Sequence, residues 1–194
     1  MLVFARLLLV PALIGLVSSC SLNRPDALAG AMRATDQDSA IVEAAAAEFM
    51  QSGDCWEGFA KDGIVVSART LSASVLSRLR LAELSSDEWG DIAPGLAKIR
   101  ERNENGQLID WHFSDGERIR DVVLTGIEAD AIDKAARYGK CVTFFALPAV
   151  ANDGRTAIVV FDVAPEYHGR TIVCRLRLVG GAWRVEGRHN FEFL

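Results

Sequence analysis

Three histidines are the side chains best suited to acid–base chemistry in this chain of 194 residues, and one of them has carboxylates close by in sequence. His112 lies two residues after Asp110 and three residues before Asp115. A histidine whose ring is held by a carboxylate can act as a general base at neutral pH. The same spacing also occurs in surface turns, so we keep a histidine–carboxylate enzyme as an alternative and assign no catalytic residue.

A second polar group lies in a predicted loop near the C-terminal end and consists of Glu166, Tyr167, His168 and Arg170. Loops carry binding residues more often than strands do. We therefore treat this group as a candidate binding loop. The third histidine, His189, alternates with Phe191, and we expect it to point outward from a strand.

The cysteines give no sign of a metal or redox site. No CxxC pair occurs in the sequence, and no cysteine stands near a histidine at the spacing of zinc ligands. Motifs for serine hydrolases, zinc proteases and phosphate-binding loops are also missing from the sequence, which therefore predicts no cofactor and no metal. Cys174 is in phase with the apolar Ile172 and Leu176 and is expected to be a buried thiol. That leaves Cys55 and Cys141 as the candidates for one disulfide bond.

The first 19 residues have the composition of a secretion signal. Arg6 is their only charged residue, and the eleven residues from Leu7 to Val17 form an apolar run that is too short to span a bilayer. The adjoining Val17-Ser18-Ser19-Cys20 resembles the lipobox of bacterial lipoproteins, in which an aliphatic residue and two small residues precede an invariant cysteine. The resemblance implies that residues 1–19 are removed. It also implies that Cys20 carries a diacylglycerol on its sulfur and an acyl chain on its amine.

The lipobox resemblance also predicts where the mature chain lies. Ser21 favours the outer membrane, facing the periplasm, because an aspartate after the cysteine is the pattern of inner-membrane retention. We expect the chain to reach the membrane through the lipid on Cys20, since a net charge of −5 gains nothing from anionic headgroups. The same acidic balance argues against nucleic acid as a partner, and leaves a protein as the second expected partner.

The chain divides into three predicted parts: a signal peptide at 1–19, the lipidated cysteine with a flexible tether at 20–38, and a single α+β domain at 39–194. A domain of that length can bury one substantial core. The tether is polar and contains Pro25 and Gly30, and as a flexible coil it would reach about 23 Å.

The N-terminal half of the domain is predicted to be mainly helical, with a strand where β-branched residues cluster. Apolar residues recur at helical spacing in several segments, and Pro94 interrupts one of these helices or restarts it. The predicted helices are 40–50, 75–84, 85–102 and 128–138, and the predicted strands are 63–69, 108–113 and 119–124.

The last third of the chain predicts four antiparallel strands, at 141–147, 156–163, 171–178 and from Trp183 onward. Asn152-Asp153-Gly154 and Gly180-Gly181 mark tight turns between them. Apolar and charged residues alternate along 171–178, which predicts a sheet with one buried face. The expected fold class is α+β, with N-terminal helices packed on a mainly antiparallel four-stranded meander of cystatin-like outline.

The C-terminal pattern resembles a family of uncharacterised bacterial α+β domains that are secreted or lipid-anchored. The likeness covers residues 60 to 187 and rests on an Asn-Asp-Gly-Arg turn, the strand TAIVVFDV and the run Gly-Gly-Ala-Trp-Arg-Val. Members of that family carry paired cysteines in a loop where this chain has residues 164–169. A fold of this kind does not by itself specify an activity.

The sequence therefore favours a lipid-anchored periplasmic protein that binds a protein or an envelope component without catalysis. One alternative is a periplasmic hydrolase that uses a histidine–carboxylate pair. A second alternative is an inhibitor or immunity-type protein that blocks an exported protein through an acidic surface. An enzyme requires a pocket where a histidine and an acid converge, whereas a binding module requires an exposed apolar patch.

Overall fold

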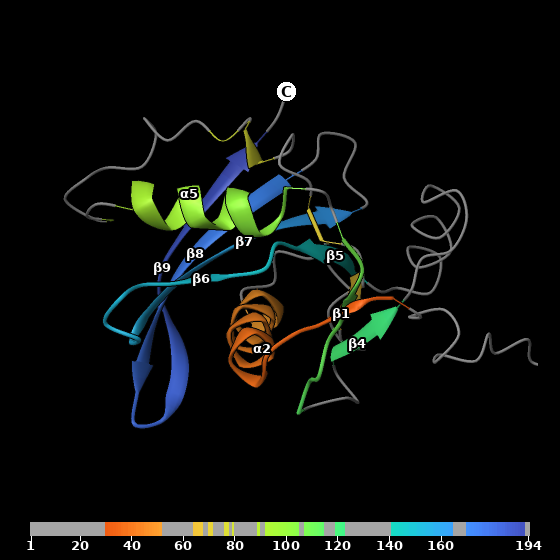
Figure 1. The fold of residues 1–194 in the computed structure, drawn as a ribbon, viewed down its shortest axis with the longest axis horizontal. Helices are drawn as coiled ribbons and strands as arrows, with labels where there is room; N and C mark the ends of the chain where they lie inside the picture. Colours follow the sequence, from red (N-terminus) through yellow and green to blue (C-terminus); the bar gives the residue numbers. More distant parts are fainter. Residues whose placement is uncertain are drawn as a thin grey trace, which may run out of the picture.

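Two helices and a mixed, mainly antiparallel β-sheet form the α+β fold of the chain in a computed structural model (Figure 1). The helices are α2 (Asp36–Gln51) and α5 (Ala93–Arg102). The structure describes residues 30–51, 64–67, 70–71, 76–77, 79, 89, 92–104, 107–114, 119–122, 141–164 and 170–192.

The main sheet has the strand order β4-β2-β5-β7-β8-β9, and the short β6 pairs beside β7. Strand β2 runs parallel to both β4 and β5, whereas β7 runs antiparallel to β5 and to β8, and β9 runs antiparallel to β8. The predicted four-strand meander is therefore present, but it continues into parallel strands that the sequence pattern did not place beside it. The strands are β2 (Ile64–Ser67), β4 (Ile119–Val122), β5 (Cys141–Phe145), β6 (Ala149–Val150), β7 (Thr156–Ala164), β8 (Arg170–Val179) and β9 (Ala182–Glu192).

Both turns predicted in the last third of the chain are confirmed. The Asn-Asp-Gly turn joins β6 to β7, and the Asp153 carboxylate accepts hydrogen bonds from the backbone N–H groups of Arg155 and Thr156. Gly180 and Gly181 join β8 to β9, and both have positive φ angles of 61° and 86°. A two-residue turn of this backbone shape matches the twist of the strands that flank it, and glycine adopts it without steric cost.

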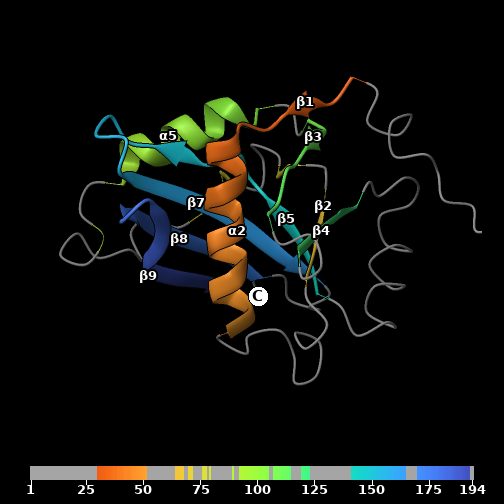
Figure 2. The same cartoon turned by 90° about the horizontal axis from the view of Figure 1, so that it is seen from below.

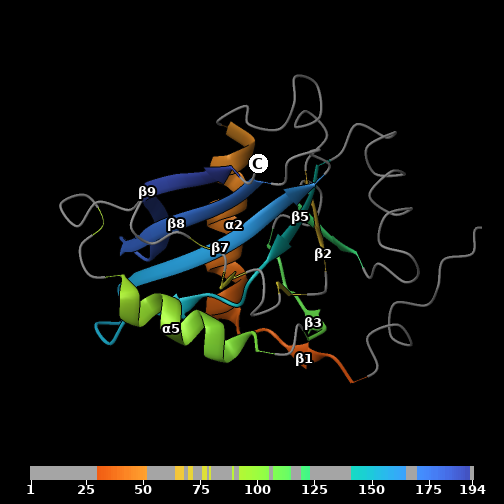
Figure 3. The same cartoon turned by 90° about the horizontal axis from the view of Figure 1, so that it is seen from above.

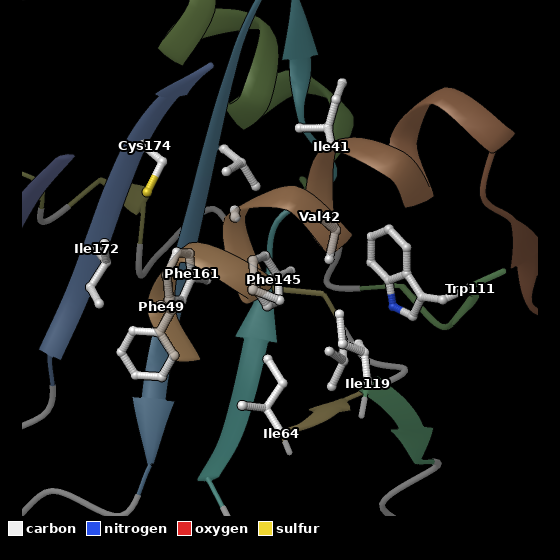
Figure 4. Packing of buried hydrophobic residues seen from close by; sticks show 14 of the residues in the cluster. Ile41, Val42, Phe49, Ile64, Trp111, Ile119, Phe145, Phe161, Ile172 and Cys174 are labelled. Atoms are coloured by element: carbon white, nitrogen blue, oxygen red, sulfur yellow. The ribbon is translucent and has the colours of Figure 1, made fainter. Parts of the chain in front are cut away.

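Both faces of the sheet are buried, so the expectation of a single buried face is wrong. Helix α2 covers one face, where Phe49 packs against Phe161 of β7 in a core that also contains Cys174 of β8 (Figure 4). Helix α5 covers the other face, where Leu96 and Ile99 join a second core. Figures 2 and 3 show the two helices on opposite sides of the strands. The residues of β8 explain the difference, because Ile172, Val173 and Cys174 are consecutive and all buried.

Secondary structure is present before residue 39, where the predicted domain starts. The tether was expected to reach Asp38, yet strand β1 (Met32–Arg33) already pairs in parallel with β3 (Ile109–Asp110). Ala34 is buried, and Asp38 lies inside the first turn of α2. A reciprocal cap explains this start: the Asp38 N–H donates to Thr35 Oγ1 at 3.0 Å, while the Thr35 N–H donates to Asp38 Oδ2 at 3.3 Å.

Helices α2 and α5 are joined by a bidentate ion pair between Asp38 and Arg102. Arg102 Nη1 and Nη2 lie 2.9 and 3.0 Å from the two carboxylate oxygens, and the Asp38 side chain is only 5% exposed. Arg102 Nη1 also donates to the Pro148 carbonyl, which lies between β5 and β6. The guanidinium plane suits two parallel hydrogen bonds to a carboxylate, so this contact fixes the relative position of the two helices.

Asn103 makes a second buried polar connection, just beyond the end of α5. Its Nδ2 donates to the carbonyls of Ile99 and Leu147 at 2.7 and 3.1 Å, and its Oδ1 accepts from the Leu147 N–H at 2.7 Å. The amide thereby pairs with the backbone of the β5–β6 connection as a neighbouring strand would. Because Asn103 is fully buried, each of these bonds replaces one that water would otherwise make.

Several expectations fall on residues outside the described part of the chain. They are the signal peptide, Cys20 and Ser21, Cys55, Asp115, the loop residues Glu166, Tyr167 and His168, and the helix predicted at 128–138. Within the described residues, no helix is both long enough and apolar enough to cross a membrane.

Candidate functional site

The structure brings His112 and Asp110 together, as their spacing suggests, and adds a partner that the spacing does not reveal. Arg33 Nε donates to His112 Nε2 at 3.0 Å, and Asp110 Oδ2 lies 3.4 Å from the same nitrogen. The parallel pairing of β1 with β3 causes this meeting, because it sets Arg33 directly opposite Asp110. The three side chains form a group on the surface, with His112 36% and Asp110 31% exposed.

In the contact with Arg33, His112 Nε2 is the hydrogen-bond acceptor. In a histidine–carboxylate base the carboxylate holds one ring nitrogen, and the other nitrogen faces the substrate. Here Asp110 and Arg33 both approach the same nitrogen. The three side chains therefore form a network of polar and charged groups at the surface. They lack the geometry of a histidine base that a carboxylate orients toward a substrate.

The chain around His112 is fastened to helix α2 by further polar contacts. The His112 N–H donates to Ser39 Oγ at 3.1 Å. Two residues later, the N–H and hydroxyl of Ser114 donate to the Glu43 carboxylate at 3.1 and 2.5 Å. The neighbouring Trp111 is buried, and its indole N–H donates to the Ser67 carbonyl at 3.3 Å. This surface is therefore held rigidly by α2 on one side and by the core on the other.

No group of three or more histidine, cysteine or acidic side chains within the described ranges is arranged to hold a metal ion. Cys174 is buried and free, as its phase with Ile172 and Leu176 predicts. Burial raises the pKa of the Cys174 thiol to about 12, although the nearby Arg188 charge acts in the opposite direction. The thiol therefore stays protonated and lacks nucleophilic character at neutral pH.

Of the two cysteines proposed to form a disulfide, Cys141 is the first residue of β5, while Cys55 lies outside the described residues. The disulfide therefore stays a prediction. Arg170, from the candidate binding loop, is the first residue of β8, opposite Glu192 in β9. His189 is half-buried, and its ring lies edge-on to Phe191 at 4.6 Å.

A further group of charged side chains lies on the β8–β9 hairpin, where the alternation in the sequence already places Arg175 and Arg177 on the outer face. Arg177 and Arg184 are directly opposite each other in the antiparallel register, and Arg175 lies two residues from Arg177 on the same face. Glu186 contributes one counter-charge, with its carboxylate 2.9 Å from Arg177 Nε. The Gly-Gly turn would have been enough to predict the pairing of Arg177 with Arg184, because a two-residue turn fixes which residues face each other.

Aromatic rings hold Arg175 and Arg188 of the hairpin beside the cores. The Arg175 guanidinium lies 6.0 Å from the ring centre of Trp89, and that of Arg188 lies 5.6 Å from the ring of Phe49 in α2. The electron-rich face of an aromatic ring attracts a guanidinium group at such distances. Arg177 and Arg184, in contrast, extend from the exposed half of the hairpin.

No protein-family model, no curated protein and no solved structure matches this chain. We therefore infer its function from its own residues and their geometry.

Proposed function

We propose that the chain is a lipid-anchored periplasmic protein that binds a protein or an envelope component without catalysing a reaction. The observation that carries the proposal is the apolar run Leu7–Val17 followed by Ser18, Ser19 and Cys20. This order places a lipid-modifiable cysteine directly after a signal-type segment. Ser21, the residue after the cysteine, favours the outer membrane as the location.

The position of the folded part supports an anchored arrangement. Strand β1 begins at Met32, twelve residues after Cys20. The domain would then work close to the membrane surface, within reach of envelope components.

The geometry of His112 favours a non-catalytic role, because Arg33 and Asp110 both approach its Nε2. Among the described residues, Met32 and Val179 are exposed large apolar side chains, at 41% and 42%. A hydrolase remains the second candidate, because Asp110 and His112 do lie in contact at 3.4 Å. We also propose that α2 packed across the β5-β7-β8-β9 meander has a cystatin-like outline, and that the domain belongs with the uncharacterised secreted α+β proteins it resembles.

The lipid anchor is tested by Cys20→Ser, with Ser21→Ala as the neighbouring control. In cells fed a labelled fatty acid, we expect C20S to lose the label and to leave the membrane fraction, because the lipid on Cys20 is the proposed source of membrane affinity. S21A should keep both properties. Unchanged sedimentation of C20S with membranes would contradict the anchor.

The binding role is tested by site-specific photocrosslinking in intact cells. A photoreactive amino acid is introduced at Met32 in one variant and at Val179 in another, which compares two sites of nearly equal exposure. We expect at least one of the two to give a discrete crosslinked product that mass spectrometry identifies as an envelope protein. The binding proposal is wrong if neither site crosslinks to any protein.

A further inference from the structure

The turn end of the β8–β9 hairpin is an exposed tip without charge. Its four residues, Val179-Gly180-Gly181-Ala182, carry no charged side chain, and all four are exposed. Val179 is 42% exposed, which is unusual among the large apolar side chains of the described residues. In Figure 1 the hairpin curves away from the rest of the sheet. An apolar side chain at such a position is available for contact with another apolar surface.

Two arginines lie directly behind this tip. The antiparallel register sets Arg177 opposite Arg184, two residues behind the pair formed by Val179 and Ala182. At the rise of a β-strand, two residues correspond to about 7 Å. Trp183 lies between the arginine pair and the tip, and it is half-buried against the core on the α2 side of the sheet. From its tip inward, the hairpin is therefore first apolar, then aromatic, then cationic.

The charge of the arginine pair is only partly balanced within the protein. Glu186 lies 2.9 Å from Arg177 Nε, whereas no ion pair between described residues involves Arg184. The adjoining turn brings Asp153 and Arg155, whose charges cancel, beside the hairpin through the Arg155 carbonyl, which accepts from β8. Like charges directly opposite each other destabilise a sheet. An anion bound between the two guanidinium groups would offset this repulsion.

We propose that this tip docks on the anionic lipid headgroups of the membrane that anchors the chain. Val179 enters the interfacial layer, and Arg177 and Arg184 contact lipid phosphates. This rests on the proposed lipid anchor and names anionic lipid as the envelope component that the tip binds. Strand β1 begins twelve residues after Cys20. Twelve residues span at most about 43 Å even when fully extended, so the anchor keeps the domain beside the bilayer.

The order of side chains along the hairpin favours a lipid surface over an acidic protein. Amphipathic segments sink about 5–10 Å into the boundary between headgroups and acyl chains, and the 7 Å or so between the tip and the arginines matches that depth. Tryptophan is enriched in the same layer, and arginine extends its charge outward to the phosphates. An acidic protein would match the two charges but not this order.

The net charge of −5 opposes an anionic surface only weakly at contact. At physiological ionic strength the screening length is about 8 Å, so charges elsewhere on the domain have little effect on the tip. The two strands of the hairpin contain five arginines and two glutamates, a local net charge of +3. The local charge therefore determines the contact between the hairpin and the headgroups.

The proposal is tested with the full chain reconstituted into vesicles whose acyl chains carry bromine, which quenches tryptophan fluorescence within the bilayer. One set of vesicles is phosphatidylcholine, and the other contains equal parts of phosphatidylcholine and phosphatidylglycerol. We expect stronger quenching with phosphatidylglycerol, and a difference that shrinks as salt is added. Trp183→Phe should remove the difference, because it removes the tryptophan beside the tip. Equal quenching in both vesicles, or a difference that W183F retains, overturns the proposal.

Charge variants test the role of the arginine pair. R177Q/R184Q should lower the docking equilibrium about 25-fold, since each arginine near an anionic surface contributes about fivefold. R177K/R184K keeps both charges and should dock within about threefold of the unmodified protein. Lys98→Gln is the matched control for Arg184→Gln, because each removes one exposed positive charge, from α5 and from the hairpin respectively. Equal losses in K98Q and R184Q overturn the assignment to the hairpin.

Two further readouts separate this proposal from the proposed function. In intact cells, a photoreactive residue at Val179 should form a lipid adduct, whereas a discrete protein product there overturns membrane docking and supports a protein partner. Flotation of the chain with phosphatidylcholine vesicles reports the anchor alone. A chain that floats without quenching that depends on phosphatidylglycerol refutes the docking and keeps the anchor. A chain that fails to float refutes the anchor on which the docking rests.

Discussion

The substitution Asp38→Asn tests how much the charge of the Asp38 carboxylate, which joins helices α2 and α5 through Arg102, contributes to stability. Asp38 accepts hydrogen bonds from both terminal nitrogens of Arg102, at 2.9 and 3.0 Å, and from the Thr35 hydroxyl at 2.8 Å. Asparagine keeps the shape of the side chain but removes its charge and one of its two acceptor oxygens. Arg102 is then left with a neutral partner beside the Pro148 carbonyl.

We expect D38N to lower the free energy of unfolding by about 2–4 kcal/mol. Loss of one partner from a fully buried ion pair costs roughly 3–5 kcal/mol. The loss expected for D38N is smaller than that of a fully buried pair because the Arg102 side chain is 28% exposed, so water can partly replace the lost contact. A domain of this size has a total stability of about 5–15 kcal/mol, so the variant still folds and its stability can be measured.

Urea unfolding followed by circular dichroism provides the measurement, and Asp36→Asn is the matched control. Asp36 occupies the same helix turn but is exposed, so it loses only its interaction with the helix dipole, about 0.3–1 kcal/mol. A double-mutant cycle with Arg102→Gln should give a coupling energy of at least about 1.5 kcal/mol. The reasoning is refuted if D38N and D36N differ by less than about 0.5 kcal/mol.

The remaining predictions concern two buried groups. Cys174 should resist iodoacetamide in the folded protein and react once urea unfolds it, because burial holds its thiol pKa near 12. Above about pH 9 the unfolded thiol ionises while the folded one stays protonated, so unfolding releases a proton. Stability relative to Cys174→Ala should then fall by roughly 1.4 kcal/mol per pH unit up to pH 12, and a constant difference across that range would contradict the pKa. Asn103→Ala should cost about 1–3 kcal/mol in urea unfolding, since it leaves the Leu147 N–H buried without an acceptor. The exposed Glu104→Ala should stay within about 0.5 kcal/mol of the unmodified protein, and equal effects of the two would show that the Asn103 contacts contribute nothing.

The C-terminal strands were predictable because their signals are local. Glycines and Asn-Asp-Gly mark the turns, and the apolar and β-branched residues between them mark the strands, in alternation along β8 and as a nearly continuous apolar run along β7. The same phase placed Cys174 in the core, which the structure confirms. Alternation along β8 predicted one buried face of the sheet, and the structure has two. The consecutive buried residues Ile172, Val173 and Cys174 depart from that alternation.

The candidate site was only partly visible in the sequence. The two-residue spacing of Asp110 and His112 does bring them into contact, but Arg33 comes from a segment 79 residues away. The segment containing Arg33 was assigned to a flexible tether on composition alone, because its polar residues gave no sign of the pairing between β1 and β3. The arginine pair of the hairpin was a local feature, and it could have been found by reading β8 and β9 in register.

The sequence by itself determined the helical phase of α2 and the turns and strands of the meander, whereas the signal segment and its cysteine stay predictions. Each of these depends on residues within a few positions of one another. The tertiary structure alone decided that Asp38 meets Arg102 across 64 residues, that β2 lies between β4 and β5, and that both faces of the sheet are covered. Contacts of this kind depend on how whole helices and strands pack, and a local pattern of apolar and polar residues is compatible with several such packings.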